Sequence, residues 1–234
     1  MKWALYDELI RRVTHDEATV RAARRTWESR TGAVDPDHDL YHERSDAFVE
    51  WFLLDRRDAQ GLSAVDRELQ RTAAQASSRP DDKAWKDLLQ SLRSSQHSLY
   101  RVIRLRPGGL LLDDLLSGCR FDVEERRSLP GVLPGDLFEA RLLPDLDAPY
   151  RLLLGRAVLF HPREAAAVVI QRATAVRESQ ALATHGSESH HREFLEDLLR
   201  LRLKALTYRH VSPARIYGLS GEAIRRPPSA AAPL

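Results

Sequence analysis

The hydrophobic pattern changes its period near residue 99, and this change constrains the fold more than any other feature of the chain. Before that point, apolar residues recur at helical spacing. From 99 to 161 they form short runs separated by turns that contain Gly and Pro. Five short runs predict a small antiparallel barrel of the SH3 or OB type, with a sheet packed on helices as the alternative. We expect its interior to hold Val102, Leu111, Val123, Phe138 and Leu152.

Helices are predicted on both sides of this segment. Residues 1–98 form a helical region in which Gly32 and Pro80 interrupt the apolar pattern. Residues 162–212 form a predicted pair of helices, and residues 213–234 have the composition of a flexible tail. The predicted fold class is therefore α+β, with a helical region, a small β-module and a C-terminal helical pair.

Two capping boxes indicate where helices begin. Thr14 and Glu17 have the spacing of a first box, and Ser63 and Asp66 have the spacing of a second. The helix that follows Thr14 is expected to end before Gly32.

The order of several motifs resembles a group of uncharacterised bacterial proteins. The motifs are "FVEWFLLDRR", "GLSAVDREL", "HSLYRVIRLRPGGLLLDDLLSG", "LPGDLFEARLLP" and "YRLLLG", and together they cover roughly 45–160. In that group a helical segment of the "WFLFD" type precedes a small β-domain, and some members resemble proteins with a C-terminal SEC-C zinc motif. The resemblance implies this architecture and no activity. The Cys and His residues of the zinc motif are absent here, so zinc binding is not carried over.

Composition narrows the class of protein. The net charge is only +2, so no strong overall field selects a partner. Cys119 is the single cysteine, which excludes a disulfide framework and a multi-cysteine zinc site. The sequence lacks an apolar run long enough to span a membrane, and "MKWALYDELIRRV" does not have the pattern of a signal peptide. We therefore expect a cytoplasmic protein without a membrane partner.

The stretch "DPDHDLYHERSD" is the first candidate for chemistry. His38 and His42 would share one face of a helix, a spacing that can hold zinc if a third ligand is supplied. A metalloprotease helix would carry Glu after the first histidine, whereas this chain has the shorter Asp39. We interpret the stretch as a helix start with a solvated acidic face, capped by Asp35 or Asp37. The sequence predicts no metal and no cofactor.

Three further groups have structural interpretations. His190 and His191 lie among acids that would stabilise the first turn of a helix. Asp113 and Asp114 are adjacent in a predicted strand, so their side chains would point to opposite faces and could not form a catalytic pair. Cys119 is interpreted as a small buried strand residue.

The β-module also has a basic surface candidate. Small barrels bind single-stranded nucleic acid with basic side chains and exposed aromatic rings. The corresponding residues here are Tyr100, Arg101, Arg104 and Arg106. Acids equal bases across this segment, so the barrel could equally bind a protein.

The helix "SHHREFLEDLLRLRLKALTYRH" is the second surface candidate. Leu201 and Leu203 fall on different faces of a helix, so one face could remain uncovered. We expect this helix and the tail after Pro213 to carry the contact with a partner, more than any pocket does. The arginines expected to surround this contact are Arg200, Arg202, Arg209 and Arg215. In the alternative, the preceding helix and the N-terminal region cover both leucine faces.

These observations predict a non-enzymatic binding or adaptor protein that acts through a macromolecular interface, with another protein as the expected partner. The alternative is a nucleic-acid-binding regulator that uses the β-module and the basic C-terminal third, where residues 163–234 carry 11 Lys+Arg and 7 Asp+Glu. A metal-dependent hydrolase built on His38 and His42 is the third possibility.

Overall fold

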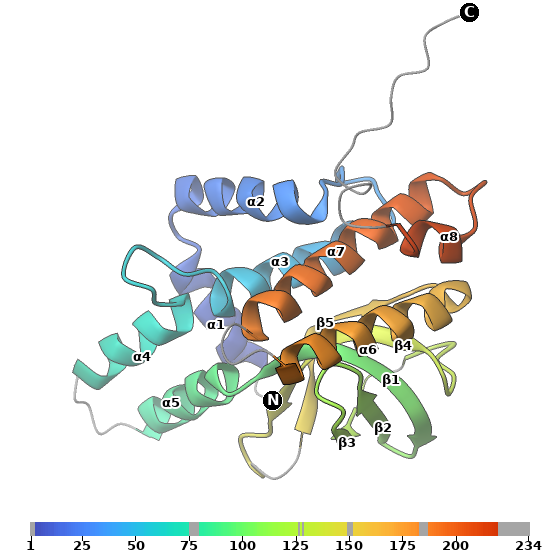
Figure 1. Cartoon of the computed structure of the whole chain (residues 1–234). Coiled ribbons are helices and arrows are strands. Elements are labelled where there is room, and N and C mark those ends of the chain that lie inside the picture. The colour runs from blue at the N-terminus through green and yellow to red at the C-terminus, as the bar shows by residue number, and fades with distance from the viewer. Residues whose placement is uncertain are drawn as a thin grey trace, which may run out of the picture.

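The computed structural model describes residues 3–74, 80–125, 127, 129–148, 152–182 and 187–219. Its class is α+β, as predicted: helices pack against a five-stranded mixed sheet that lies at one end of the molecule (Figure 1). None of the described helices is both long and apolar enough to cross a membrane.

The N-terminal region is helical. Its helices are α1 (Trp3–Val13), α2 (Glu17–Thr31), α3 (Tyr41–Leu54), α4 (Ala64–Ala74) and α5 (Pro80–Arg93). The predicted Ser63 box is confirmed, because the Asp66 N–H donates to Ser63 Oγ and the Ser63 N–H donates to Asp66 Oδ2. The Thr14 box is wrong: Asp16 caps α2, and the Thr14 hydroxyl donates to the carbonyl of Ile10 in the preceding helix.

Five strands follow as predicted, namely β1 (Gln96–Arg106), β2 (Gly109–Asp114), β3 (Arg120–Glu124), β4 (Leu137–Pro144) and β5 (Leu152–Phe160). They close in the order β1-β2-β3-β5-β4. The expectation of an entirely antiparallel sheet is wrong, because β3 and β5 pair in parallel over Val123 and Glu124. The ring is irregular, since register shifts interrupt β1 against β2 and β4 against β5.

The interior of the ring is apolar. Val102, Val123 and Phe138 are buried there as predicted, and Leu152 packs against them while partly buried. Leu111 does not belong to this cluster, and Leu110 and Leu112 point inward in its place. The register shift after Val102 decides this, because a one-residue change of register exchanges the two faces of a strand.

The chain returns to helix after β5. A short 3-10 turn, η1 (Arg163–Ala165), leads into α6 (Ala166–Leu182), and α7 (Ser187–Thr207) and α8 (Pro213–Tyr217) follow. The predicted flexible tail therefore begins with a helix, and residues 220–234 lie outside the described part.

A buried polar cluster connects helix α8 to the sheet. The Tyr217 hydroxyl lies 3.0 Å from His161 Nδ1, and His161 Nε2 lies 3.0 Å from Glu139 Oε1 on β4. The three side chains are buried, and Tyr217 also packs in the apolar core beneath α6 and α7. Helix α8 is therefore part of the folded core.

Helix α7 joins the two helical regions. Leu199 packs with Trp27 and Phe48 of α2 and α3, whereas Leu198 and Leu201 pack with the residues of α6 and α8. Figure 1 shows α7 beside α3, with the sheet below them. The N-terminal and C-terminal helices thus share cores across the boundaries that the sequence pattern predicts.

Candidate functional site

The predicted histidine pair does not share a helix face. His38 lies in a turn before α3, and its Nδ1 is 3.1 Å from the N–H of Leu40. His42 is exposed in the first turn of α3, whose N-cap is Leu40 and not an aspartate. Within the described ranges, no three His, Cys, Asp or Glu side chains are placed to hold a metal ion. His38 therefore lies in the turn over 36–40, off the helix that carries His42.

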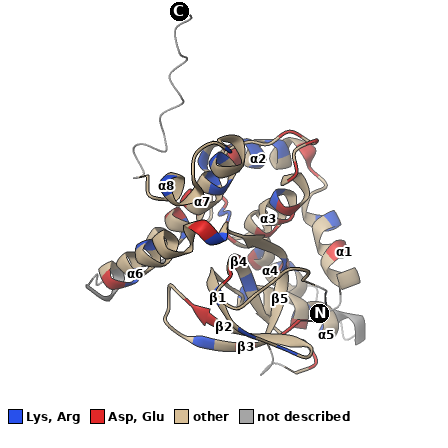
Figure 2. Cartoon of the chain, turned by 90° about the vertical axis from the view of Figure 1, so that its right-hand side faces the viewer, with Lys and Arg blue, Asp and Glu red and all other residues tan. Residues whose placement is uncertain are grey.

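The predicted nucleic-acid residues of β1 do not form a stacking surface. Tyr100 is fully buried inside the sheet, so its ring cannot stack on a base. Arg101 binds Asp113 at 2.8 Å, and Arg106 donates to Asp122 at 2.6 Å. Arg104 is exposed. Figure 2 shows basic and acidic residues interspersed over the described ribbon, without a continuous basic stripe along the strands.

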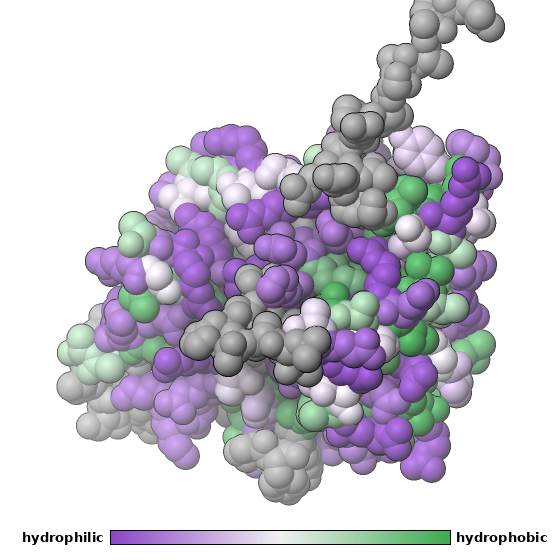
Figure 3. All heavy atoms as spheres, viewed as in Figure 1, coloured by the Kyte–Doolittle hydropathy of each residue, from purple (hydrophilic) through white to green (hydrophobic). Residues whose placement is uncertain are grey.

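The predicted leucine face of α7 is covered at Leu201, which is fully buried, and Leu203 is partly buried against Gly32 at the end of α2. The burial of Leu201 corrects the expectation that this residue lies on an uncovered face. The face seen in Figure 3 is mainly hydrophilic. The large hydrophobic residues exposed in the described ranges are Leu105 and Leu133, both in the β-module.

The arginines of α7 have partners within the protein. Arg202 is buried and donates to Glu43 at 2.6 Å, and Arg200 donates to the carbonyl of Arg30. Arg209 is exposed and donates to the carbonyl of Leu206 at 3.3 Å. Arg215 is exposed on α8. Arg200 and Arg202 therefore connect α7 to the N-terminal helices.

Of the other sequence candidates, the two aspartates of β2 have structural roles, whereas Cys119 and His190 are exposed. Asp114 is buried and accepts hydrogen bonds from Ser98 and from the backbone of Leu116, so it shapes the turn after β2. Asp113 instead binds Arg101 and Arg120, as expected for the opposite face. Cys119 is exposed just before β3, which corrects its interpretation as a buried residue. His190 is exposed near the start of α7.

A polar cleft lined by charged side chains from several elements is the candidate site in the described part of the chain. It has a volume of about 440 Å³ and opens to solvent where the ends of α3 and α5 meet the start of β1 and the first turns of α7. That volume falls within the range of small-molecule and side-chain pockets. Its charged and imidazole lining comprises Asp55, Asp66, Arg57, Arg93, Arg141, Arg192, His97 and His191.

An ion network forms the floor of the cleft. Arg141 of β4 is buried, donates to Asp55 at the end of α3, and lies 3.6 Å from Glu50. Burial alone would raise the pKa of Asp55, but the charge of Arg141 outweighs it and the pKa lies below the ordinary 3.8. Burial raises the pKa of Glu50. The Arg141–Asp55 pair is therefore ionised in the interior.

A bulge in β5 makes room for this network. Leu142 pairs with Leu154 and Ala140 pairs with Val158, so β5 carries extra residues opposite β4. A Cβ on Gly155 would lie 2.8 Å from Glu50 Oε1, and the N–H of Ala157 donates to the same oxygen at 3.0 Å. Gly155 lies in this bulge and admits a carboxylate against the strand.

His97 also lines the floor. Burial lowers its pKa to about 3, and the nearby charges of Arg141 and Arg192 act in the same direction. The imidazole is therefore neutral at neutral pH. It can offer one donor and one acceptor to a group in the cleft.

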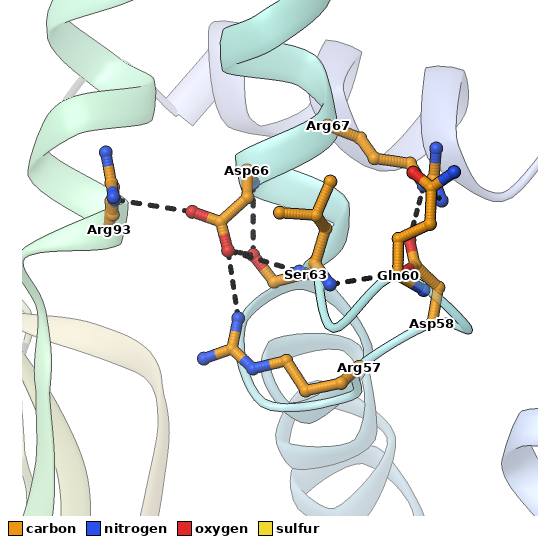
Figure 4. A network of polar contacts seen from close by, with 8 residues as sticks. Arg57, Asp58, Gln60, Ser63, Asp66, Arg67 and Arg93 are labelled. Atoms are coloured by element: carbon orange, nitrogen blue, oxygen red, sulfur yellow. Dashed lines mark hydrogen bonds and ion pairs between the residues drawn. The ribbon is translucent and has the colours of Figure 1, made fainter.

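The rim of the cleft is held by Asp66. Its carboxylate binds Arg57 at 2.9 Å and Arg93 at 3.3 Å, and it also accepts from the Ser63 hydroxyl (Figure 4). Figure 4 shows Arg57 and Arg93 approaching Asp66 from two sides, from the loop before α4 and from α5. Hydrogen bonds from Ser63 and the charges of these arginines outweigh burial and hold the pKa of Asp66 below its ordinary value. The Ser63–Asp66 capping box at the start of α4 thus also positions two cations.

Arg192 supplies a third cation. It lies in the first turns of α7, and its charge acts on both Asp55 and His97. Among the residues that the structure describes, it makes no hydrogen bond or ion pair. Four arginines against two aspartates leave the lining with an excess of positive charge. The cleft can therefore accept an anionic group.

Sequence reasoning did not identify this site. Asp55, His97, Arg141 and Arg192 come from four elements, and Asp55 and Arg141 are 86 positions apart. Only the Ser63–Asp66 box carried a local signal, and that signal indicated a helix start. Pairings between distant elements have no periodic pattern in the sequence by which they could be found.

Comparison with known proteins does not assign this chain to a family. Neither protein-family models, nor curated proteins, nor solved structures gave a match to this chain. The resemblance to the bacterial group with a "WFLFD" segment therefore remains a prediction.

Proposed function

We propose that this chain is a non-enzymatic cytoplasmic binding or adaptor protein that contacts a protein partner at the polar cleft. The observation that carries the proposal is an open cleft whose arginines outnumber its aspartates. The floor is occupied by the Arg141–Asp55 pair, which favours a structural role for those two residues. The surrounding Arg57, Arg93 and Arg192 remain available to a partner.

A second candidate function is nucleic-acid binding by the β-module. Strand β4 returns beside β1, so the order β4-β1-β2-β3 is a Greek key, and β5 completes the ring. A five-stranded Greek-key barrel is the OB type, which binds oligonucleotides, and we propose this type over the SH3 type. The burial of Tyr100 and the acidic partners of Arg101 and Arg106 count against this function. A metal-dependent hydrolase built on His38 and His42 has less support, because a turn separates these histidines.

Site-specific photo-crosslinking in native cells tests these alternatives. A photoreactive residue replaces Ser95 in the cleft, Arg104 on the β-module, or Ser179 on the exposed surface of α6 as a control. We expect a discrete protease-sensitive adduct from position 95 and none from position 179. A nuclease-sensitive adduct from position 104 would favour nucleic-acid binding instead. Equal labelling from all three positions would contradict a defined interface.

A further inference from the structure

We propose that the cleft recognises a polypeptide carboxylate, which Arg57, Arg93 and Arg192 hold together. The carboxylate belongs either to an acidic side chain or to a C-terminus. This inference deepens the proposed function and rests on it, because it names the group that the partner would insert.

The three guanidinium groups retain donors for a ligand. Arg57 donates to Asp66 through Nη1, and Arg93 contacts Asp66 through Nε. Each guanidinium group therefore has further N–H groups that do not contact Asp66. The side chain of Arg57 is 46% exposed and that of Arg93 is 69% exposed, whereas that of Arg141 is 5% exposed. Guanidinium groups bind carboxylates through paired, charge-assisted hydrogen bonds. The exposed arginines of the rim are therefore suited to bind the ligand, whereas Arg141 already contacts Asp55 and Glu50.

The charge of the lining favours a carboxylate over a phosphate. Asp55 and Asp66 stay within the cleft and both have lowered pKa values, so they are ionised at neutral pH. Their negative charge opposes any anion that enters, and it opposes a doubly charged phosphate more than a singly charged carboxylate. A small positive excess therefore matches a single negative charge.

The floor suits the polar backbone that accompanies a peptide carboxylate. Asp55 offers carboxylate oxygens, and the neutral ring of His97 offers a donor and an acceptor. A peptide brings N–H and C=O groups beside its carboxylate, and these groups match the floor. A free inorganic anion has no N–H donors for Asp55.

Binding to three short labelled peptides of equal length tests the inference by fluorescence anisotropy. The first peptide has internal glutamates and an amidated C-terminus. The second has a free C-terminus and no acidic side chain. The third has glutamines in place of the glutamates and an amidated C-terminus. We expect one of the first two to bind and the third not to bind. The peptide that binds identifies the source of the carboxylate. Inorganic phosphate and a single-stranded oligonucleotide serve as competing probes.

Variants connect the binding to the cleft. Arg192→Gln is expected to weaken the affinity for the peptide about tenfold or more, because a hydrogen bond to a charged group is lost. Arg57→Gln should lower the peptide affinity as well, and Arg192→Lys should lower it less than Arg192→Gln does. Arg21→Gln, on the exposed surface of α2, removes the same charge away from the cleft and should leave binding unchanged. Urea unfolding of each variant verifies that the fold is retained.

The outcomes separate this inference from the proposed function. Equal weakening by Arg21→Gln and Arg192→Gln would show a general charge effect and overturn the inference. Tighter binding of phosphate or of the oligonucleotide, lost in Arg192→Gln, would also overturn it. If no peptide binds while position 95 still gives a protein adduct, the carboxylate assignment fails and the proposed function stands. If position 95 gives no adduct either, both fail.

Discussion

The guanidinium group of Arg141 on β4 donates a hydrogen bond to the carboxylate of Asp55, the residue that ends α3. This pair links the sheet to the N-terminal helices beneath the cleft. Glu50 Oε2 lies 3.6 Å from Nε of the same guanidinium group. The stability of the fold and the shape of the candidate site therefore depend on the same ion network.

Replacing Arg141 should destabilise the protein strongly. We expect Arg141→Met to lower the free energy of unfolding by about 3–5 kcal/mol, because Asp55 and Glu50 would lose their buried counter-charge. Urea unfolding measures the change. Arg21→Met, which removes an exposed helical ion pair, is the matched control and should cost less than about 1 kcal/mol. Equal losses in both variants would contradict the role given to the network.

The lowered pKa of His97 should make stability depend on pH. The folded chain keeps His97 neutral down to a pKa of about 3, whereas the unfolded chain takes up a proton below the ordinary 6.5. The contribution of His97 is therefore complete above pH 6.5 and declines as the pH falls toward 3. At pH 5 the loss is up to about 2 kcal/mol.

Urea unfolding between pH 5 and pH 7.5 measures this dependence. His97→Asn should flatten the decline, whereas His42→Asn, which changes an exposed histidine, should leave it as in the parent protein. The same decline in all three proteins would assign the effect to other groups.

Glycine at position 32 should be required more strictly than at position 61. Both have a positive φ, 90° and 77°, so an alanine at either position costs about 1–2 kcal/mol in backbone strain. At Gly32 the added Cβ would also lie 2.7 Å from Leu203 Cδ2, whereas Gly61 has open space. We expect Gly32→Ala to be less stable than Gly61→Ala by about 1 kcal/mol or more in urea unfolding. The reverse order would exclude close contact between α2 and α7.

Helix α8 should contribute to global stability. Tyr217→Phe removes the hydroxyl partner of His161 and should cost about 1 kcal/mol. Tyr217→Ala also removes a buried ring and should cost about 3–5 kcal/mol. Arg215→Ala on the exposed side of α8 should change stability by about 0.5 kcal/mol or less. Thermal unfolding in which Tyr217→Ala matches the parent protein would show that α8 is not docked.

The sequence by itself determined the order and type of the elements from α1 to α7, but it did not predict helix α8. Alternating runs between Gly and Pro turns predicted five strands, and the Ser63–Asp66 box predicted the start of α4. These features depend on residues that are close in the chain, so a local pattern contains them. The box at Thr14 failed where a second acceptor, Asp16, competed for the same helix start.

Only the tertiary structure decided which side chains were left for function. Tyr100 and Leu201 had the pattern of surface candidates, but the closure of the ring and the packing of α6 and α8 buried them. Arg141 and Asp55 gave no signal, because their pairing depends on how β4 and α3 meet across 86 positions. Burial and long-range ion pairing are set by the packing of whole elements. A sequence pattern therefore predicts helices and strands, whereas a cleft between them exists only after they have packed.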